Sequence, residues 1–306
     1  MLSRLILTVS ITLLLAACGP DEEATPAPSP GPTPEPAPDV TRDTPERTEN
    51  DIREQLQEAV LGEHRSEANR ARDRYRNPVE TLAFFDLAPD HTVVEVWPGA
   101  GWYTEILAPV LRDRGQLVVA NFPTDSESGM VARIGQALVD KLEAEPEIYD
   151  RVEVVTYSPP QATTLGEPGS ADLVLLSRHF HNLIANDAVD TTLEAAFEVL
   201  RSGGTLAVLQ HRLPPERDFD PEVRTGYVPE DFVIGAAERA GFEFAARSEI
   251  NANPLDTADH EQGVWALPPS YRACDDVEDE AQRSLCRQEW DAIGESDRMT
   301  LRFTRP

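Results

Sequence analysis

Short apolar runs alternate with longer amphipathic segments over residues 90–248 of this chain. The runs predict strands at 90–96, 117–121, 152–157, 171–177, 205–210 and 242–248. The segments between them place apolar residues three and four apart, which predicts helices at 103–112, 131–145, 190–200 and 229–240. Because strand and helix alternate, we expect an α/β fold with a doubly wound, mostly parallel sheet. Residues 298–303 predict a last strand, antiparallel and at an edge of the sheet.

The region before the sheet, residues 47–90, is predicted to be helical. Apolar residues recur from Ile52 to Leu61, and Pro78 can open a second helix at 79–85. The region also carries several basic side chains, at Arg65, Arg70, Arg72, Arg74 and Arg76. Two interpretations stay open. These side chains pair with nearby acids on a solvated helix face, or they form a lid that brings Tyr75 and an arginine over a ligand.

Residues 91–306 are then the α/β domain, with a helical excursion at 270–295 that carries Cys274 and Cys286. An even pair of cysteines in an exported protein predicts a disulfide. On one straight helix the two would lie about 18 Å apart, which is too far to bond. The disulfide therefore requires a turn between them, near residues 277–280. No metal site is predicted, because no histidine stands near the pair.

The first residues predict export. Arg4 and the apolar run that follows it are typical of a signal peptide at 1–17, and the run is too short for a permanent membrane span. Residues 15–18 resemble the lipobox of bacterial lipoproteins, which implies lipidation of Cys18. Proline at every second residue from Pro26 to Pro38 predicts an extended tether over residues 18–46. We expect a lipid anchor in the outer membrane facing the periplasm, with inner-membrane anchoring or secretion as alternatives.

The chain of 306 residues carries 27 Lys and Arg against 55 Asp and Glu, a net charge of −28. Nucleic acids are bound by clustered basic residues, so a nucleic-acid partner is not expected. Anionic lipid would also repel this surface, which leaves the N-terminal anchor as the expected membrane contact. The pattern does not predict an oligomeric state.

Residues 93–103, VVEVWPGAGWY, predict a strand, a glycine turn and the start of a helix. Gly99 and Gly101 allow a tight turn and a close approach of a ligand, since neither has a Cβ. The N–H groups of the helix start suit a carboxylate or a phosphate. A dinucleotide fingerprint would need glycine or alanine where Thr104 stands, so that interpretation is weak. A purely structural turn remains an alternative.

The spacing of Glu95, Gly99 and Gly101 resembles the first motif of class I S-adenosylmethionine-dependent methyltransferases, although Trp97 replaces a usual glycine. Residues 70–89, 93–109, 177–183, 203–212, 253–256 and 296–306 together resemble a group of exported bacterial proteins described as predicted methyltransferases. The resemblance implies that the fold binds S-adenosylmethionine. It implies cofactor contacts at Glu95, Trp97, Gly99, Gly101, Tyr103, Asn121, Tyr157 and Ser158. Asn121 replaces the acid that usually binds the ribose.

A second concentration of polar chemistry follows the strand at 171–177. Arg178, His179 and His181 come directly after it, and His211 ends the strand at 205–210. Because parallel strands place their carboxyl ends at one edge of the sheet, we expect these side chains near Gly99. They are the candidate catalytic residues, which would orient or deprotonate an acceptor.

Two functions fit this pattern. The first is an anchored S-adenosylmethionine-dependent methyltransferase that acts on a small molecule or an envelope component. The second is a non-catalytic ligand-binding lipoprotein on the same fold, because the cofactor is made in the cytoplasm and an exported protein works elsewhere. The sequence does not identify the methyl acceptor.

Overall fold

The computed structural model describes residues 49–306. The predicted signal peptide (1–17), the lipidation site at Cys18 and the tether (18–46) lie outside the described residues. Within residues 49–306, no helix combines the length and the apolar character that a membrane crossing requires.

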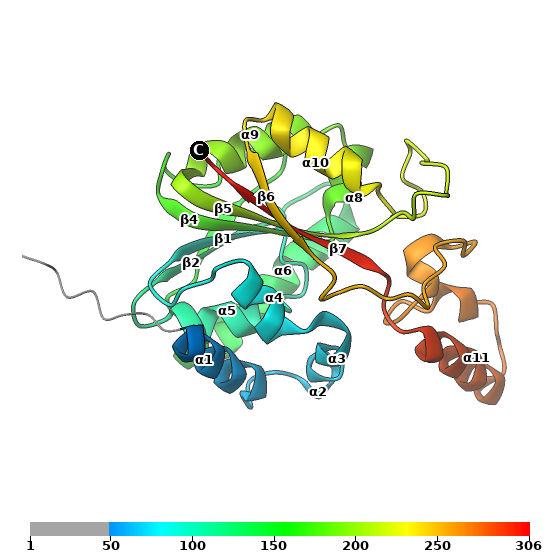
Figure 1. Ribbon diagram of the computed structural model, residues 1–306. Coiled ribbons are helices and arrows are strands. Elements are labelled where there is room, and N and C mark those ends of the chain that lie inside the picture. Colours follow the sequence, from blue (N-terminus) through cyan, green and yellow to red (C-terminus); the bar gives the residue numbers. More distant parts are fainter. Residues whose placement is uncertain (1–48) are drawn as a thin grey trace, which may run out of the picture. The chain divides into compact units, whose positions relative to one another are not determined.

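Seven strands in the described residues form one sheet in the order β3-β2-β1-β4-β5-β7-β6 (Figure 1). Their bounds are β1 Thr92–Val96, β2 Gln116–Asn121, β3 Glu153–Thr156, β4 Ala171–Ser177, β5 Leu200–His211, β6 Glu243–Ser248 and β7 Arg298–Thr304. Strands β1 to β5 pair in parallel, and β7 runs antiparallel to β5 and β6. The predicted α/β fold class is confirmed.

The prediction for the last strand is correct in direction and wrong in place. Strand β7 is antiparallel, but it lies between β5 and β6, so that β6 forms the edge. Both faces of β7 are covered, since Met299, Leu301 and Phe303 are fully buried on one face and Thr300 is 1% exposed on the other. A strand with neighbours on both sides contributes its alternate residues to both covered faces of the sheet.

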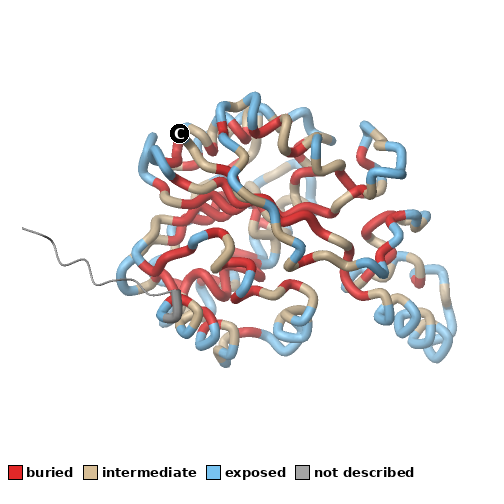
Figure 2. The backbone as a smooth tube through the Cα atoms, viewed as in Figure 1, coloured by how far each residue is buried: buried red, intermediate tan, exposed pale blue. Residues whose placement is uncertain are grey.

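Helices cover both faces of the sheet, which Figure 2 shows as a buried layer between more exposed helices. The helices are α1 Glu49–Leu61, α2 Glu67–Arg70, α3 Asp73–Arg76, α4 Pro78–Phe84, α5 Thr104–Leu111, α6 Gly129–Ala144, α7 Pro146–Tyr149, α8 Phe180–Ala185, α9 Val189–Val199, α10 Glu230–Arg239 and α11 Glu280–Ile293. Alternate residues of β1 face opposite sides. Val93 packs with α1, α4, α5 and α6, whereas Val94 packs with α8, α9 and α10.

The N-terminal region is helical in pieces. The helix predicted from residue 50 ends at Leu61, and short helices α2 and α3 follow Gly62. The solvated-face interpretation is wrong for Arg65 and Arg76, which are 1% and 2% exposed. Arg65 donates two hydrogen bonds to the Asp73 carboxylate, both of 2.7 Å. A guanidinium is buried in this way only where carboxylates or carbonyls receive its donors.

The C-terminal excursion contains the predicted disulfide, Cys274–Cys286. Two short 3-10 helices, Gly263–Ala266 and Arg272–Cys274, precede α11. The required turn lies before α11, where the Asp279 side chain accepts the N–H of Gln282 and caps the helix. In the described structure α11 buries none of its residues, and the disulfide ties it to the rest of the domain together with hydrogen bonds from Tyr271 to Asp291 and from Asn253 to the Ile293 carbonyl.

Candidate functional site

The glycine turn after β1 has the backbone that the sequence predicts. Gly99 and Gly101 have φ angles of 61° and 77°, a region that disfavours residues with a Cβ. A Cβ on Gly101 would lie 3.1 Å from Leu138 Cδ1, so packing against α6 requires that glycine. A Cβ on Gly99 would meet nothing within 4 Å. Gly99 therefore borders open space at the carboxyl edge of the sheet.

Glu95 lies beneath this turn and is 2% exposed. Its Oε2 accepts a hydrogen bond of 2.7 Å from Thr104 Oγ1, which ties β1 to the first turn of α5. Burial raises the pKa of Glu95 to about 7, although the Thr104 bond and the charge of Lys141 act in the other direction. Glu95 is thus placed at the turn as predicted, with its carboxylate already held by the protein.

This raised pKa gives a pH-dependent stability. The unfolded chain ionises Glu95 near the ordinary glutamate pKa of 4.5, and the folded chain does so near 7, so stability falls as pH rises through that interval. We expect wild type to lose roughly 2 to 3 kcal/mol relative to Glu95→Gln between pH 5 and pH 8. Urea unfolding of both proteins at the two pH values measures the difference. A constant difference would contradict the assignment.

Trp97 occupies the carboxyl ends of the central strands. Its indole stacks on Phe122, with centroids 4.9 Å apart, and meets His179 edge-on at 5.8 Å. Its Nε1 donates a hydrogen bond of 3.0 Å to the Tyr157 carbonyl oxygen. The φ angle of Trp97 is 50°, which costs a bulky residue about 1 to 3 kcal/mol. The ring contacts offset that strain and bury the indole to 6% exposure.

The other residues predicted to contact the cofactor also lie at the carboxyl edge of the sheet, but the groups around them differ. Asn121 ends β2, and its Nδ2 donates to the Gly135 carbonyl oxygen at 2.9 Å. Its Oδ1 is buried and has no hydrogen-bond partner among residues 49–306. The Tyr157 ring is fully buried and its hydroxyl donates to Thr192 Oγ1 at 2.8 Å. The backbone N–H groups of Tyr157 and Ser158 donate to the carbonyl oxygens of Asn121 and Ala162, so neither these groups nor the Tyr157 ring is open to the predicted adenine contact.

The four candidate catalytic residues meet in one cavity of about 250 Å³, which Arg178, His179, His181 and His211 all line. Sequence reasoning missed the part of the wall that the segment between β6 and β7 supplies through Val264, Trp265, Pro268, Pro269, Ser270, Glu295 and Ser296. The topology of the sheet could have predicted two of these residues, Glu295 and Ser296. Because β7 is antiparallel, the residues just before it lie at the edge where β4 and β5 end.

Burial keeps the three histidines neutral near pH 7. It lowers the pKa of His179 to about 3 and that of His181 to about 4, and it lowers the pKa of His211 well below its ordinary value. Charges nearby, chiefly from His181 and Arg178, add to the effect on His179 and His211. Uncharged imidazoles can accept a proton or donate one hydrogen bond.

Hydrogen bonds distinguish the roles of His181 and His211. The Gln210 amide is oriented, because its oxygen accepts from Phe180 N–H and its nitrogen donates to the Gly226 carbonyl. That nitrogen also lies 3.2 Å from His181 Nδ1, which must accept and leaves the proton on Nε2. His211 Nδ1 lies 2.5 Å from Ser296 Oγ, a group that can donate or accept. Only His211 of this pair can therefore carry a lone pair on Nε2.

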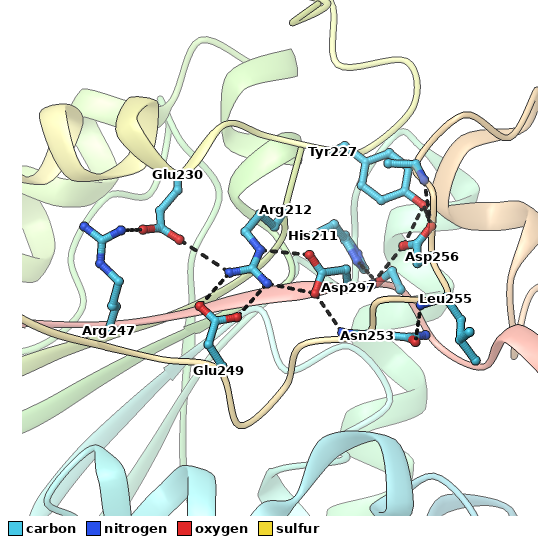
Figure 3. Close-up of polar contacts among 12 residues, drawn as sticks. His211, Arg212, Tyr227, Glu230, Arg247, Glu249, Asn253, Leu255, Asp256 and Asp297 are labelled. Carbon is cyan, nitrogen blue, oxygen red and sulfur yellow. Dashed lines mark hydrogen bonds and ion pairs between the residues drawn. The ribbon is translucent and has the colours of Figure 1, made fainter. Parts of the chain in front are cut away.

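A network of charged groups beside the cavity fixes its walls (Figure 3). Arg212 follows His211 and holds two acids, Asp297 at 2.8 Å and Glu249 at 2.8 Å. Asp297 also accepts the Asn253 N–H at 2.8 Å. Asp256 accepts from the Asp297 N–H and the Tyr227 hydroxyl. These contacts hold the start of β7, and with it Ser296, against His211.

Four guanidiniums surround one carboxylate at the inner end of the cavity. Glu295 accepts hydrogen bonds from Arg72 Nε at 2.6 Å and Arg76 Nε at 2.9 Å. Arg298 Nη1 and Arg178 Nη1 lie 3.2 and 4.0 Å from its Oε2. Burial alone would raise the pKa of Glu295, but the four positive charges outweigh it and hold that pKa far below its usual range. This carboxylate therefore stays ionised.

Comparisons with solved structures bear on the fold. The [4+2]-cyclase SpnF superimposes with a TM-score of 0.50 at 15% identity, over 84% of this chain and 93% of its own. A SAM-dependent methyltransferase from Aquifex aeolicus gives 0.47 at 20% identity, over 59% and 87%. Geranyl diphosphate C-methyltransferase from Streptomyces coelicolor gives 0.47 at 10% identity, over 84% and 97%. Neither a protein-family model nor a curated protein matches the sequence.

The fold is class I methyltransferase-like. The order of the strands and the antiparallel β7 establish it, together with the superposition on SpnF. At these identities the likeness concerns the fold alone, and function has to be argued from the site. Within residues 49–306, no three His, Cys, Asp or Glu side chains are placed to hold a metal ion.

Proposed function

We propose that the protein is an S-adenosylmethionine-dependent methyltransferase. The observation that carries the proposal is Gly99, which stands at the carboxyl end of β1, in a left-handed conformation, with open space where a Cβ would be. A backbone of this kind lets a ligand approach closely. The fold class and the spacing from Glu95 to Gly101 support S-adenosylmethionine as the ligand that approaches this turn.

The residues at the strand ends fit this cofactor. Asn121 Oδ1 is a buried acceptor without a partner among the described residues, and a ribose hydroxyl would satisfy it. Gly99, Gly101 and the start of α5 would hold the methionine end. The bound cofactor supplies a methyl group on a positively charged sulfur. The protein's part is to align an acceptor with it, which needs positioning more than acid–base power.

The cavity beside the turn supplies the groups for the acceptor. His211 is neutral and shares Nδ1 with Ser296, so its Nε2 can accept a hydrogen bond from a hydroxyl or an amine, although its lowered pKa makes it a weak base. His181 presents an N–H at Nε2, which orients an acceptor atom. His211 acts as a base only for an acceptor that loses a proton in the reaction.

The proposal also covers where the enzyme is anchored and what kind of acceptor it methylates. Export and lipidation at Cys18 would place the enzyme in the outer membrane facing the periplasm, attached through its N-terminal lipid. Its acceptor would then be a small molecule or an envelope component. The sequence of residues 1–46 supports this part of the proposal.

The position of Trp97 favours a second candidate, a ligand-binding protein that does not methylate. The indole already fills space between Phe122, Tyr157 and His179, where the resemblance implies a cofactor. On this candidate S-adenosylmethionine is excluded, and Trp97→Gly would admit it. Tighter cofactor binding by Trp97→Gly than by wild type would identify the second candidate.

Thermal unfolding with and without cofactor tests the proposed function. A ligand that binds only the folded state stabilises it, by about 2.7 kcal/mol at a concentration 100 times the Kd. We expect S-adenosylmethionine to raise the Tm in a concentration-dependent way, and adenosine to raise it less. An unchanged Tm at millimolar S-adenosylmethionine would contradict the proposal.

A further inference from the structure

A cluster of arginines that reaches the cavity through Arg72 and Arg178 carries a positive charge that the protein itself does not neutralise. Arg72, Arg76, Arg178 and Arg298 face the single carboxylate of Glu295, so four positive charges and one negative leave a formal balance of +3. In the described part of the chain, none of the four has an ion pair with another acid. A chain of net charge −28 therefore concentrates positive charge in this one place.

Several donors in this cluster have no partner. Arg76 Nη2 and Arg298 Nε are buried without a hydrogen-bond acceptor among residues 49–306, and so is Arg72 Nη2. Arg76 and Arg298 are 2% and 4% exposed. Buried guanidinium donors are costly to leave unpaired, and an oxyanion is the group that their planar fork fits.

Arg178 extends the cluster to the cavity. Its side chain makes no hydrogen bond within residues 49–306, and its ion pair with Glu295 is the long one, at 4.0 Å. Burial and the charges of Arg72 and Arg298 together lower its pKa to about 10 against the pull of Glu295, so it remains charged at neutral pH. Its φ angle of 60° is a strained one for arginine. The strained backbone directs this half-buried cation to the cavity wall.

The rest of the wall is partly apolar, and Asn182, Ser270 and Ser296 add polar groups to it. Val264, Trp265 and Pro268 line the cavity together with the arginines and histidines. A volume of about 250 Å³ suits a compact molecule rather than a cofactor of the size of S-adenosylmethionine. The lining contains neither Glu95 nor the two turn glycines, so this space is separate from the glycine turn.

We propose that this cavity binds a small organic anion, in which a carboxylate or phosphate is held by Arg72 and Arg178 and a compact apolar body lies against Trp265. The assignment of this anion as the methyl acceptor rests on the proposed function. The binding of the anion does not, because every residue that carries it lies outside the glycine turn.

Calorimetric titration of the whole protein with three probes tests the proposal without cofactor. Benzoate and phenyl phosphate carry the anion, and benzamide is a neutral molecule of nearly the same shape. We expect at least one anion to bind ten times or more tightly than benzamide. Equal affinity of benzoate, phenyl phosphate and benzamide, or no binding of either anion, would overturn it.

Variants locate the site. Arg178→Gln and Arg72→Gln should each weaken binding of the anion at least tenfold. Arg112→Gln is the matched control, since Arg112 is similarly half-buried, pairs with Asp150 and lies outside the cavity. Loss of binding in the control, or unchanged binding in both cavity variants, would overturn the assignment.

Repeating the titration with saturating S-adenosylhomocysteine separates the acceptor from the cofactor. Retained anion binding supports the acceptor assignment. Displacement would overturn it, because the arginines would then hold the carboxylate of the cofactor itself. If S-adenosylhomocysteine does not bind at all, the proposed function fails while the result without cofactor stands.

Discussion

Glu295→Gln is expected to lower the free energy of unfolding by about 3 to 5 kcal/mol, the cost of removing one partner from a buried ion pair. Glu295 is 3% exposed and is the only acid in contact with four guanidiniums in the described structure. Glutamine keeps the shape and removes the charge. Arg76 and Arg298 would then lie buried with no anion to offset their mutual repulsion.

Urea unfolding at neutral pH measures this effect, and Glu249→Gln is its control. Glu249 also pairs with an arginine, at 2.8 Å, but its side chain is 62% exposed. Exposed pairs contribute about 1 kcal/mol or less. A loss for Glu295→Gln no larger than that of the control would contradict the account of the arginine cluster. Benzoate should partly restore the variant if the anion replaces the lost carboxylate.

Trp97→Ala is expected to cost about 3 to 5 kcal/mol, as for other buried aromatic side chains replaced by alanine. The substitution removes the stack on Phe122, the edge contact with His179 and the hydrogen bond to the Tyr157 carbonyl. Trp97→Gly should cost about 1 kcal/mol less than Trp97→Ala, because glycine adopts the φ of 50° without strain.

Trp290→Ala is the control for this pair. Trp290 lies on α11, which buries no residue, and its ring meets His260 edge-on at 5.1 Å. Its loss should destabilise the domain by clearly less than the loss of Trp97. Chemical unfolding of the three variants measures the order. If Trp97→Gly is the least stable of the three variants, the backbone at Trp97 is not strained.

Much of the fold could be predicted from the sequence because its central strands β1, β2 and β4 are buried apolar runs. The place of β7 could not, since alternation marks a strand but does not name its neighbours. The burial of Arg65 and Arg76 could not be predicted from the sequence pattern either. An arginine in a basic helical segment is normally solvated, and only the fold brings Asp73 and Glu295 to these two.

The candidate site could be predicted in part for a similar reason. Residues that end parallel strands share one edge, and this rule brought Arg178, His179, His181 and His211 together. Glu295 and Ser296 come from the far end of the chain, where the predicted excursion ends, and the sequence pattern did not indicate that this end returns to the cavity. The role of Trp97 could not be predicted, because the sequence of a turn does not indicate which residues the indole ring packs against.

Calorimetric titration of S-adenosylmethionine into wild type, Gly99→Ala and Gly169→Ala tests the proposed function most directly. Both glycines have positive φ, 61° and 73°, and a Cβ on either meets nothing within 4 Å, so the two variants carry the same backbone strain. Only Gly99 borders the proposed cofactor site. The account predicts micromolar binding by wild type and Gly169→Ala, and at least tenfold weaker binding by Gly99→Ala. Equal affinities for the two variants, or no binding by wild type at millimolar cofactor, would contradict it.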